Sequence, residues 1–203
     1  MTIVSLKPGK SDDTRRLELS DGSLFSFNPC YLDAVFFDDT RYTAGVELSP
    51  GEEEQFRFAS SCLRGERAAL RLISRAEQTS FGLGHKLEKA GYPRSCVNAV
   101  LARLRELNIV DDSRYARIWL QARLGHRVES PRHLLAALRR RGISRQNAEL
   151  ALQTVLNPAA EKALLDSYLK KNRLPETGGT PDIARILKRE GFSPDLIHSY
   201  RAN

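Results

Sequence analysis

Apolar positions recur at a fixed spacing before three glycines in the last two-thirds of the chain. Leucine or isoleucine stands eight and four positions before Gly91, Gly142 and Gly191, with basic residues in between. Residues four apart share one face of a helix, so each segment predicts an amphipathic helix. Each glycine stands where a helix end favours a left-handed residue. The glycines are 51 and 49 positions apart, and this regularity predicts an internal repeat.

A further helix is expected on each side of these three segments. Four of the expected helix starts are marked by a hydroxyl residue that can act as an N-cap, in most cases with proline after it. The capping residues are Ser130, Thr180 and Ser193, with Thr79 or Ser80 in the first copy. Helices of about three turns are marginal in water, so they must pack on each other and on the next repeat.

We therefore predict a mainly α protein with three tandem three-helix repeats that form an elongated, curved array. The predicted boundaries are 1–58 for an N-terminal β-hairpin region with a capped linker helix, then 59–109, 110–154 and 155–203 for the repeats. A single compact helical bundle with accidental internal similarity is the alternative.

The N-terminal region has apolar residues at alternate positions. Leu17 and Leu19 alternate with polar residues, Asp21 and Gly22 supply a two-residue turn, and residues 24–27 (LFSF) return. This pattern predicts a β-hairpin. A lone hairpin is marginal, so we expect it to pack on a helix or on the first repeat.

Two start signals follow the hairpin. Asn28 before proline can cap a short helix through Tyr31, Ala34 and Val35, although residues 35–37 (VFF) would also serve as a strand. Residues 49–52 (SPGE) form a capping box, which predicts a helix that runs toward Arg64.

Charge is divided unevenly along the chain. Residues 1–63 hold 6 Lys/Arg against 11 Asp/Glu, residues 64–153 hold 18 against 8, and residues 154–203 hold 8 against 6. An acidic head joined to a basic middle favours a partner that is a polyanion or has an acidic surface. A solubilising charged surface is the other interpretation.

No apolar run is long enough for a signal peptide or a membrane span. Cys30, Cys62 and Cys96 are odd in number and have no CxxC spacing. We therefore expect a cytoplasmic protein without disulfides, in a reducing compartment.

No motif in the chain indicates catalysis, a metal or a cofactor. The four histidines lack a metal-ligand spacing such as HExxH. Gly82 and Gly84 suggest a phosphate loop only superficially, because they lie within a helical pattern. Asp111 and Asp112 resemble a paired carboxylate, but the start of a helix explains their charge better. We expect a binding protein and no enzyme.

Basic residues are the candidate binding surface. Arg64, Arg67, Arg71 and Arg75 are spaced to form a row along the first helix, and three consecutive arginines precede Gly142. Asp and Glu are too scarce in 64–153 to neutralise them. The predicted partner- or nucleic-acid-binding residues are Arg64, Arg67, Arg71, Arg75, Lys86, Arg123, Arg127, Arg132, Arg139, Arg140, Arg141, Arg145, Lys188 and Arg189.

From about Arg64 to its end the chain resembles the RecX family, the regulators of the RecA recombinase. The similarity rests on residues 69–77 (ALRLISRAE), residues 104–116 (LRELNIVDDSRYA) and residues 188–193 (KREGFS). The sequence departs from the family at Gly82, where many members have glutamate, and at residues 127–131, which lack a glycine-proline-arginine entry.

The resemblance implies a monomeric, non-enzymatic protein of recombination, DNA repair and the SOS response. It implies binding to RecA and its nucleoprotein filament, with inhibition of filament extension, strand exchange and DNA-dependent ATP hydrolysis. The alternative is a protein that binds single- or double-stranded DNA, or RNA, directly through its tri-helical modules. An adaptor of an unrelated helical-repeat type is a third interpretation.

Overall fold

A computed structural model describes residues 1–32, 37–177 and 179–202. Contacts divide the chain into two compact units. The first contains Met1–Gln78 and Leu83–Val110, and the second contains Thr79–Gly82 and Asp111–Asn203. The first unit has one hydrophobic core cluster, and the second unit has two.

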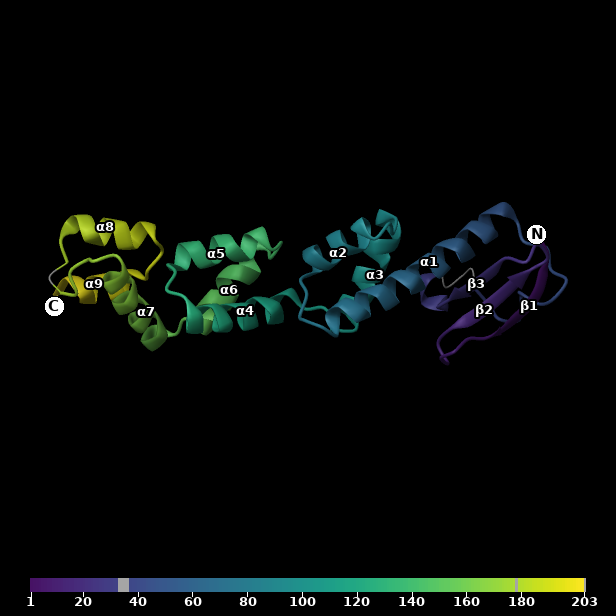
Figure 1. The fold of residues 1–203 in the computed structure, drawn as a ribbon, viewed down its shortest axis with the longest axis horizontal. Helices are drawn as coiled ribbons and strands as arrows, with labels where there is room; N and C mark the ends of the chain where they lie inside the picture. Colours follow the sequence, from purple (N-terminus) through teal and green to yellow (C-terminus); the bar gives the residue numbers. More distant parts are fainter. Residues whose placement is uncertain (33–36, 178, 203) are drawn as a thin grey trace. The chain divides into compact units, whose positions relative to one another are not determined.

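The first unit begins with an antiparallel sheet in the order β1-β2-β3 (Figure 1). Its strands are β1 (Ile3–Pro8), β2 (Arg15–Leu19) and β3 (Leu24–Phe27). The expected hairpin is confirmed: Leu17 pairs with Phe25, and Gly22 has φ of 83° in the turn. Strand β1 was not expected, because a register shift between Ile3 and Ser5 breaks its alternation.

The expected cap at Asn28 is also confirmed. Its Oδ1 accepts a hydrogen bond from the Cys30 N–H (3.0 Å) at the start of the short 3-10 helix η1 (Pro29–Tyr31). The expected continuation through Ala34 and Val35, or a strand there, lies outside the described residues.

Helix α1 (Pro50–Ile73) opens with the predicted capping box between Ser49 and Glu52. The helix runs without a break through residues 58 and 59. The predicted boundary between the N-terminal region and the first repeat lies within this helix, and it stays a prediction. Helices α2 (Ser80–Lys89) and α3 (Arg94–Glu106) follow. The buried face of α1 packs against both β3 and α3, and it thereby joins the sheet to the first repeat.

A buried polar network supports this packing. Glu66 of α1 is 8% exposed, and its carboxylate accepts hydrogen bonds from the Tyr31 hydroxyl (2.8 Å) and the Arg103 Nε–H (3.3 Å). The Tyr31 ring and the Arg103 guanidinium are also 5.9 Å apart. Burial and the neighbouring carboxylate raise the pKa of Tyr31, which keeps its hydroxyl protonated as the donor.

The regular elements in the described part of the second unit are helices. Its elements are α4 (Asp112–His126), α5 (Pro131–Arg140), α6 (Arg145–Val155), α7 (Pro158–Lys171), α8 (Pro181–Arg189) and α9 (Pro194–Ala202). The expected caps are confirmed at Ser130 and Thr180, whose hydroxyls accept from backbone N–H groups three residues on. In the first copy the cap is Thr79, which accepts from Gly82 N–H (2.9 Å).

The repeat pattern corresponds to structure in all three copies. Gly91, Gly142 and Gly191 have φ of 89°, 82° and 86°, the left-handed region that favours glycine. The apolar residues eight and four positions before each glycine are buried. The mainly α fold with a small β-region is therefore confirmed, while the curvature of the array stays a prediction.

Candidate functional site

Positive charge is concentrated around a hollow in the second unit. A groove of about 370 Å³, here called the arginine groove, is formed by α5, α6 and the end of α8. Its lining residues are Arg132, Leu135, Ala136, Arg139, Arg145, Ala148, Glu149, Arg189 and Gly191. Aliphatic side chains thus stand among four arginines and a single carboxylate.

Most of the groove's charge is not neutralised. Arg145 Nε pairs with Glu149 Oε1 at 2.7 Å, and both side chains are well exposed. The side chains of Arg132, Arg139 and Arg189 are exposed and have no hydrogen bond or ion pair to any residue that the structure describes. Guanidinium groups that are free in this way are suited to carboxylates or phosphates, which they bind through two parallel hydrogen bonds.

The local fold explains how these arginines meet. Arg132 and Arg139 are seven residues apart, so α5 presents them on one face. The N–H of Arg132 donates to the Glu190 carbonyl oxygen (2.9 Å), and Ser130 Oγ donates to Glu190 Oε2 (2.6 Å). These two bonds, here called the Ser130 joint, fix the start of α5 on the turn after α8 and hold Arg189 at the groove.

A second hollow of about 360 Å³ has Arg123, His133, Arg140 and Lys171 among its lining residues. Among them, Arg123 and Lys171 have partners within the fold. Arg123 Nη2 pairs with Glu129 Oε1 (2.7 Å), which lowers the pKa of Glu129, and Lys171 Nζ donates to the Val128 carbonyl (2.7 Å). This hollow therefore offers less free charge than the arginine groove.

Arg141 has a structural position that its sequence context did not reveal. Its Nη1 donates to the Ala137 carbonyl (2.9 Å), and its guanidinium lies 4.5 Å from the ring centroid of Trp119. Arg123 lies 5.4 Å from the same ring. Cation–π contacts of this kind stabilise the fold, so these two arginines are less available to a partner than Arg139 and Arg140.

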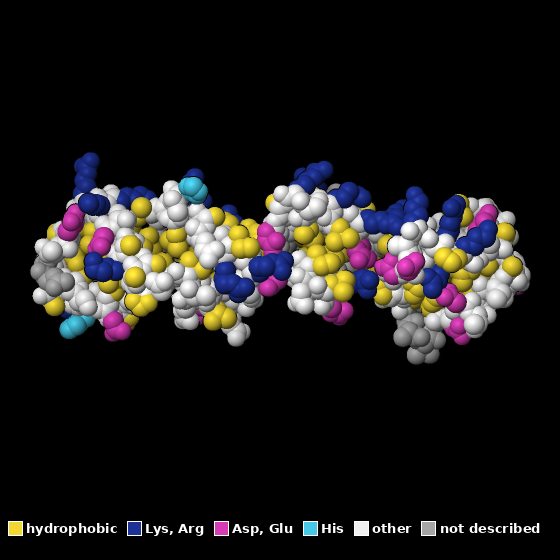
Figure 2. Space-filling view, turned by 90° about the horizontal axis from the view of Figure 1, so that it is seen from below, with side chains coloured by type: hydrophobic (Ala, Val, Ile, Leu, Met, Phe, Trp, Pro, Cys, Tyr) yellow, Lys and Arg dark blue, Asp and Glu magenta, His cyan; other side chains and the backbone are white. Residues whose placement is uncertain are grey.

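The other predicted site residues are spread over both units. Arg64, Arg67 and Arg71 are exposed on α1, but α1 ends at Ile73. Arg75 therefore lies beyond the helix, and the expected row is one residue shorter than the spacing suggested. The remaining three residues are exposed: Lys86 of α2, which donates to Gln78 Oε1 (2.7 Å), Arg127 after α4, and Lys188 of α8. Figure 2 shows acidic side chains among the basic ones on one face of the chain.

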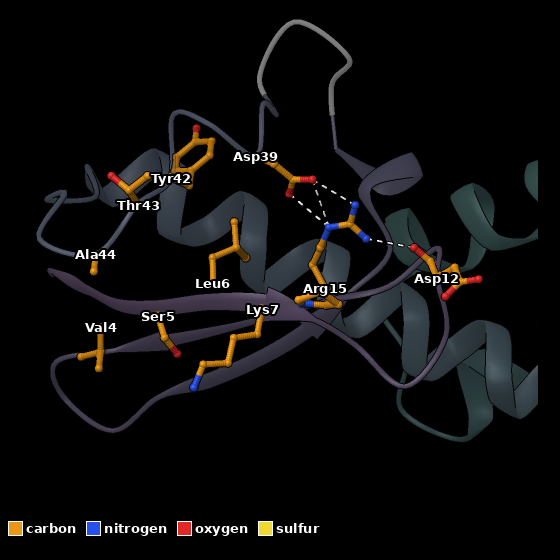
Figure 3. Close-up of a pocket in the computed structure, with 11 residues that line it drawn as sticks. Val4, Ser5, Leu6, Lys7, Asp12, Arg15, Asp39, Tyr42, Thr43 and Ala44 are labelled. Carbon is orange, nitrogen blue, oxygen red and sulfur yellow. Dashed lines mark hydrogen bonds and ion pairs between the residues drawn. The ribbon is translucent and has the colours of Figure 1, made fainter.

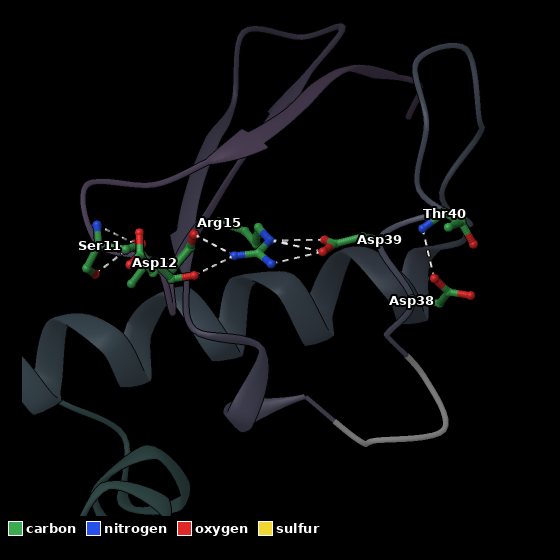
Figure 4. A network of polar contacts seen from close by, with 7 residues as sticks. Ser11, Asp12, Arg15, Asp38, Asp39 and Thr40 are labelled. Carbon is green, nitrogen blue, oxygen red and sulfur yellow. Dashed lines mark hydrogen bonds and ion pairs between the residues drawn. The ribbon is translucent and has the colours of Figure 1, made fainter.

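The head contains a larger hollow, of about 610 Å³, along β1 (Figure 3). Its principal cation is already satisfied. Arg15 donates from Nε and Nη2 to the Asp39 carboxylate (2.9–3.2 Å), and from Nη1 to the carbonyls of Asp12 and Thr14 (3.0 and 3.1 Å). This network joins the turn at residues 11–14 to residues 38–40 (Figure 4). The exposed Lys7 is the other cation in the lining, so this hollow offers less free charge than the arginine groove.

The carboxylates at the start of α4 have structural partners. Asp111 Oδ1 accepts from the N–H groups of Ser113 (2.8 Å) and Arg114 (3.0 Å), which confirms its expected role at a helix start. These bonds, with Arg114 the larger contributor, lower the pKa of Asp111. Asp112 Oδ1 accepts from the Ser80 N–H (2.8 Å).

Within the described residues, no group of three or more His, Cys, Asp and Glu side chains is arranged to hold a metal ion. The described helices also include none that is long and apolar enough to cross a membrane.

The fold and the groove define a helical-repeat protein with a β-sheet at its N-terminal end and a groove lined by arginines. A family model for the second three-helix domain of RecX matches residues 111–152. The regulatory protein RecX of Treponema pallidum (strain Nichols) is 37% identical over 140 residues, which cover 69% of this chain and 85% of that protein. The chain therefore belongs to the RecX family of regulatory proteins.

Other members agree with this assignment. The regulatory protein RecX of Thermobifida fusca (strain YX) is 33% identical over 141 residues, covering 66% of this chain and 75% of that protein. A crystal structure of a regulatory protein RecX superposes over 100% of this chain and 99% of its own, with a TM-score of 0.68 and 19% identity. That of RecX from Lactobacillus salivarius covers 70% and 95%, with a TM-score of 0.54 and 20% identity. The two structures support the fold.

Proposed function

We propose that this protein binds the RecA recombinase and its nucleoprotein filament, and that it thereby limits filament extension, strand exchange and DNA-dependent ATP hydrolysis. Membership of the RecX family supports the partner. The observation that carries the contact surface is the arginine groove, which three free guanidinium groups line together with aliphatic side chains. Such a surface suits carboxylates on a protein partner.

Binding through several weak contacts fits a repetitive partner. Arg64, Arg67 and Arg71 form a second exposed basic row on α1, in the other unit. A single exposed ion pair contributes only about 0.2–1 kcal/mol, so neither surface alone predicts tight binding. Two surfaces on one chain make the second contact intramolecular, which raises the effective concentration and therefore the affinity for a filament that presents many equivalent sites.

The second candidate function is direct binding to nucleic acid, because free arginines fit phosphates as well as carboxylates. Positioning contacts to phosphate carry no sequence information, and the lining of the arginine groove has no asparagine or glutamine to read base edges. Trp119, the only tryptophan, is already engaged by two arginines. These features favour the protein partner.

A binding comparison tests the proposal. The full chain is titrated against single-stranded DNA, against RecA alone, and against the nucleotide-bound RecA filament, at two salt concentrations. We expect the filament to bind most tightly, and substoichiometric protein to slow DNA-dependent ATP hydrolysis. Equal, strongly salt-dependent binding to bare DNA with no preference for the filament would support the second candidate and reject the first.

A further inference from the structure

The arginine groove adjoins a second hollow of different character. This hollow has a volume of about 300 Å³, and its lining residues are Pro131, Leu135, Glu149, Leu152, Gln153, Leu156, Glu161, Gly191 and Ser193. Leu135, Glu149 and Gly191 also line the arginine groove. The two hollows are therefore adjacent, and together they are here called the composite groove.

Helix α6 runs along both parts of the composite groove. Arg145 and Glu149 line the arginine groove, whereas Leu152 and Leu156 line the second hollow. These positions are four, three and four residues apart, so they lie on one face of the helix and its end. At about 1.5 Å per residue they span about 16 Å. The composite groove thus has cations at one end and leucines at the other, about three helical turns apart in total length.

The carboxylates at the leucine end already have partners. Glu161 Oε1 accepts a hydrogen bond from the Ser193 N–H (2.7 Å), and Glu149 pairs with Arg145. Leu135 and Leu156 are half-buried on the core of their own repeat, which leaves part of each side chain open to the hollow. Covering this apolar surface is favourable, so a ligand at this end is recognised by apolar contact.

We propose that the composite groove binds one helical segment of a protein partner, with carboxylates at the arginine end and leucine-like side chains at the other end. The lining consists of helices and one turn. An extended segment would leave its backbone groups unpaired over the leucines, whereas a helix pairs its own. Unstacked bases bind mainly on aromatic or guanidinium planes, so the aliphatic end favours a protein ligand over nucleic acid.

The source of the segment is the RecA recombinase, and this assignment rests on the proposed function. The chemistry of the segment can be tested without the recombinase. The probe is a fluorescently labelled peptide of about 12 residues, cross-linked between solvent-facing positions so that it stays helical. It has glutamates in its first turn and leucines in its last turn. One control peptide has glutamines in place of the glutamates, and the other has serines in place of the leucines.

Fluorescence anisotropy with the full chain measures the affinity of each peptide. We expect the probe to bind at least about tenfold more tightly than either control. Added salt should weaken binding of the probe and of the serine control, because both carry the carboxylates, and it should leave the glutamine control nearly unchanged.

Two single substitutions on α6 place the apolar contact. Gln153 and Thr154 are both exposed, but only Gln153 lines the composite groove. Gln153→Glu puts a charge where the leucines of the probe must displace water, so it should weaken probe binding about fivefold or more. Thr154→Glu changes the net charge equally and should stay within about twofold of the wild type.

Equal binding of the three peptides, no binding of the probe, or equal effects of the two substitutions would overturn the inference. If Gln153→Glu fails to fold by circular dichroism, the three peptides on the wild type still decide. Slowing of RecA ATP hydrolysis by the wild type, without selective peptide binding, would reject this inference and leave the proposed function standing. Selective peptide binding by a wild type that does not affect RecA would do the reverse.

Discussion

Replacing Ser130 with alanine tests the joint that assembles the arginine groove. The hydroxyl is completely buried. It caps α5 by accepting from the His133 N–H (3.4 Å), lies 2.8 Å from His133 Nδ1, and donates to Glu190 Oε2 at 2.6 Å. The substitution removes the cap and leaves a carboxylate whose side chain is only 13% exposed without its closest donor.

The magnitude follows from these two losses. An N-cap serine contributes about 1 kcal/mol to the free energy of unfolding. A hydrogen bond to a charged, mostly buried group contributes about 1.5–3 kcal/mol. We therefore expect Ser130→Ala to lower the free energy of unfolding of the second unit by about 3 kcal/mol.

Ser144→Ala is the matched control, because Ser144 caps α6 in the same repeat and is exposed, with its hydroxyl bonded to the Asn147 N–H (3.1 Å). It should cost only about 1 kcal/mol. Urea unfolding followed by the fluorescence of Trp119, the only tryptophan, reports the second unit. If the two variants differ by less than about 0.5 kcal/mol, the hydrogen bond to Glu190 does not stabilise the joint.

Two further predictions concern a glycine turn and acid stability. Gly142→Ala should lower the free energy of unfolding more than Gly91→Ala does. Both substitutions force a non-glycine residue into the left-handed region, which costs about 1–2 kcal/mol, but only at Gly142 would the new Cβ also overlap the Cβ of Phe81. Equal losses of stability in thermal unfolding would contradict this. The lowered pKa of Asp111 means that its contribution to stability is present above its unfolded pKa of about 4 and is lost as pH falls through the lower folded value. Asp111→Asn should therefore lose less stability than the wild type between pH 7 and pH 3 in urea unfolding, and parallel losses would rule out this contribution.

The parts of the fold that could be predicted are those whose signals are local. Each repeat places its two apolar positions and its glycine within nine residues, so the helix, its buried face and its end could be inferred together. Strand β1 could not be, because the register shift between Ile3 and Ser5 places its two core-facing residues, Ile3 and Leu6, three positions apart and so breaks the two-residue period. The network of Tyr31, Glu66 and Arg103 joins residues 35 and 37 positions apart, and no short pattern indicates it.

The candidate site could be predicted by residue type but not by partner. Arg139 and Arg141 look equivalent in the sequence, yet Arg139 lines the arginine groove, whereas Arg141 covers the ring of Trp119 and bonds to the Ala137 carbonyl. This difference depends on the packing of α5 against α4. The role of Glu190 was missed for the same reason, since its partner Ser130 lies 60 residues away.

The central claim is that the arginine groove contacts the recombinase filament, and charge reversal there tests it most directly. The variant Arg132→Glu with Arg139→Glu changes the net charge by the same amount as the control Lys162→Glu with Arg185→Glu, whose sites are exposed in the same unit but do not line the groove. The readout is the protein concentration that halves DNA-dependent ATP hydrolysis by RecA.

Losing two exposed ion pairs of about 0.7 kcal/mol each corresponds to roughly tenfold. We therefore predict that the groove variant, folded by circular dichroism, needs about ten times more protein than the wild type, while the control stays within about twofold. Undiminished inhibition by the folded groove variant, or equal losses in both variants, would contradict the claim.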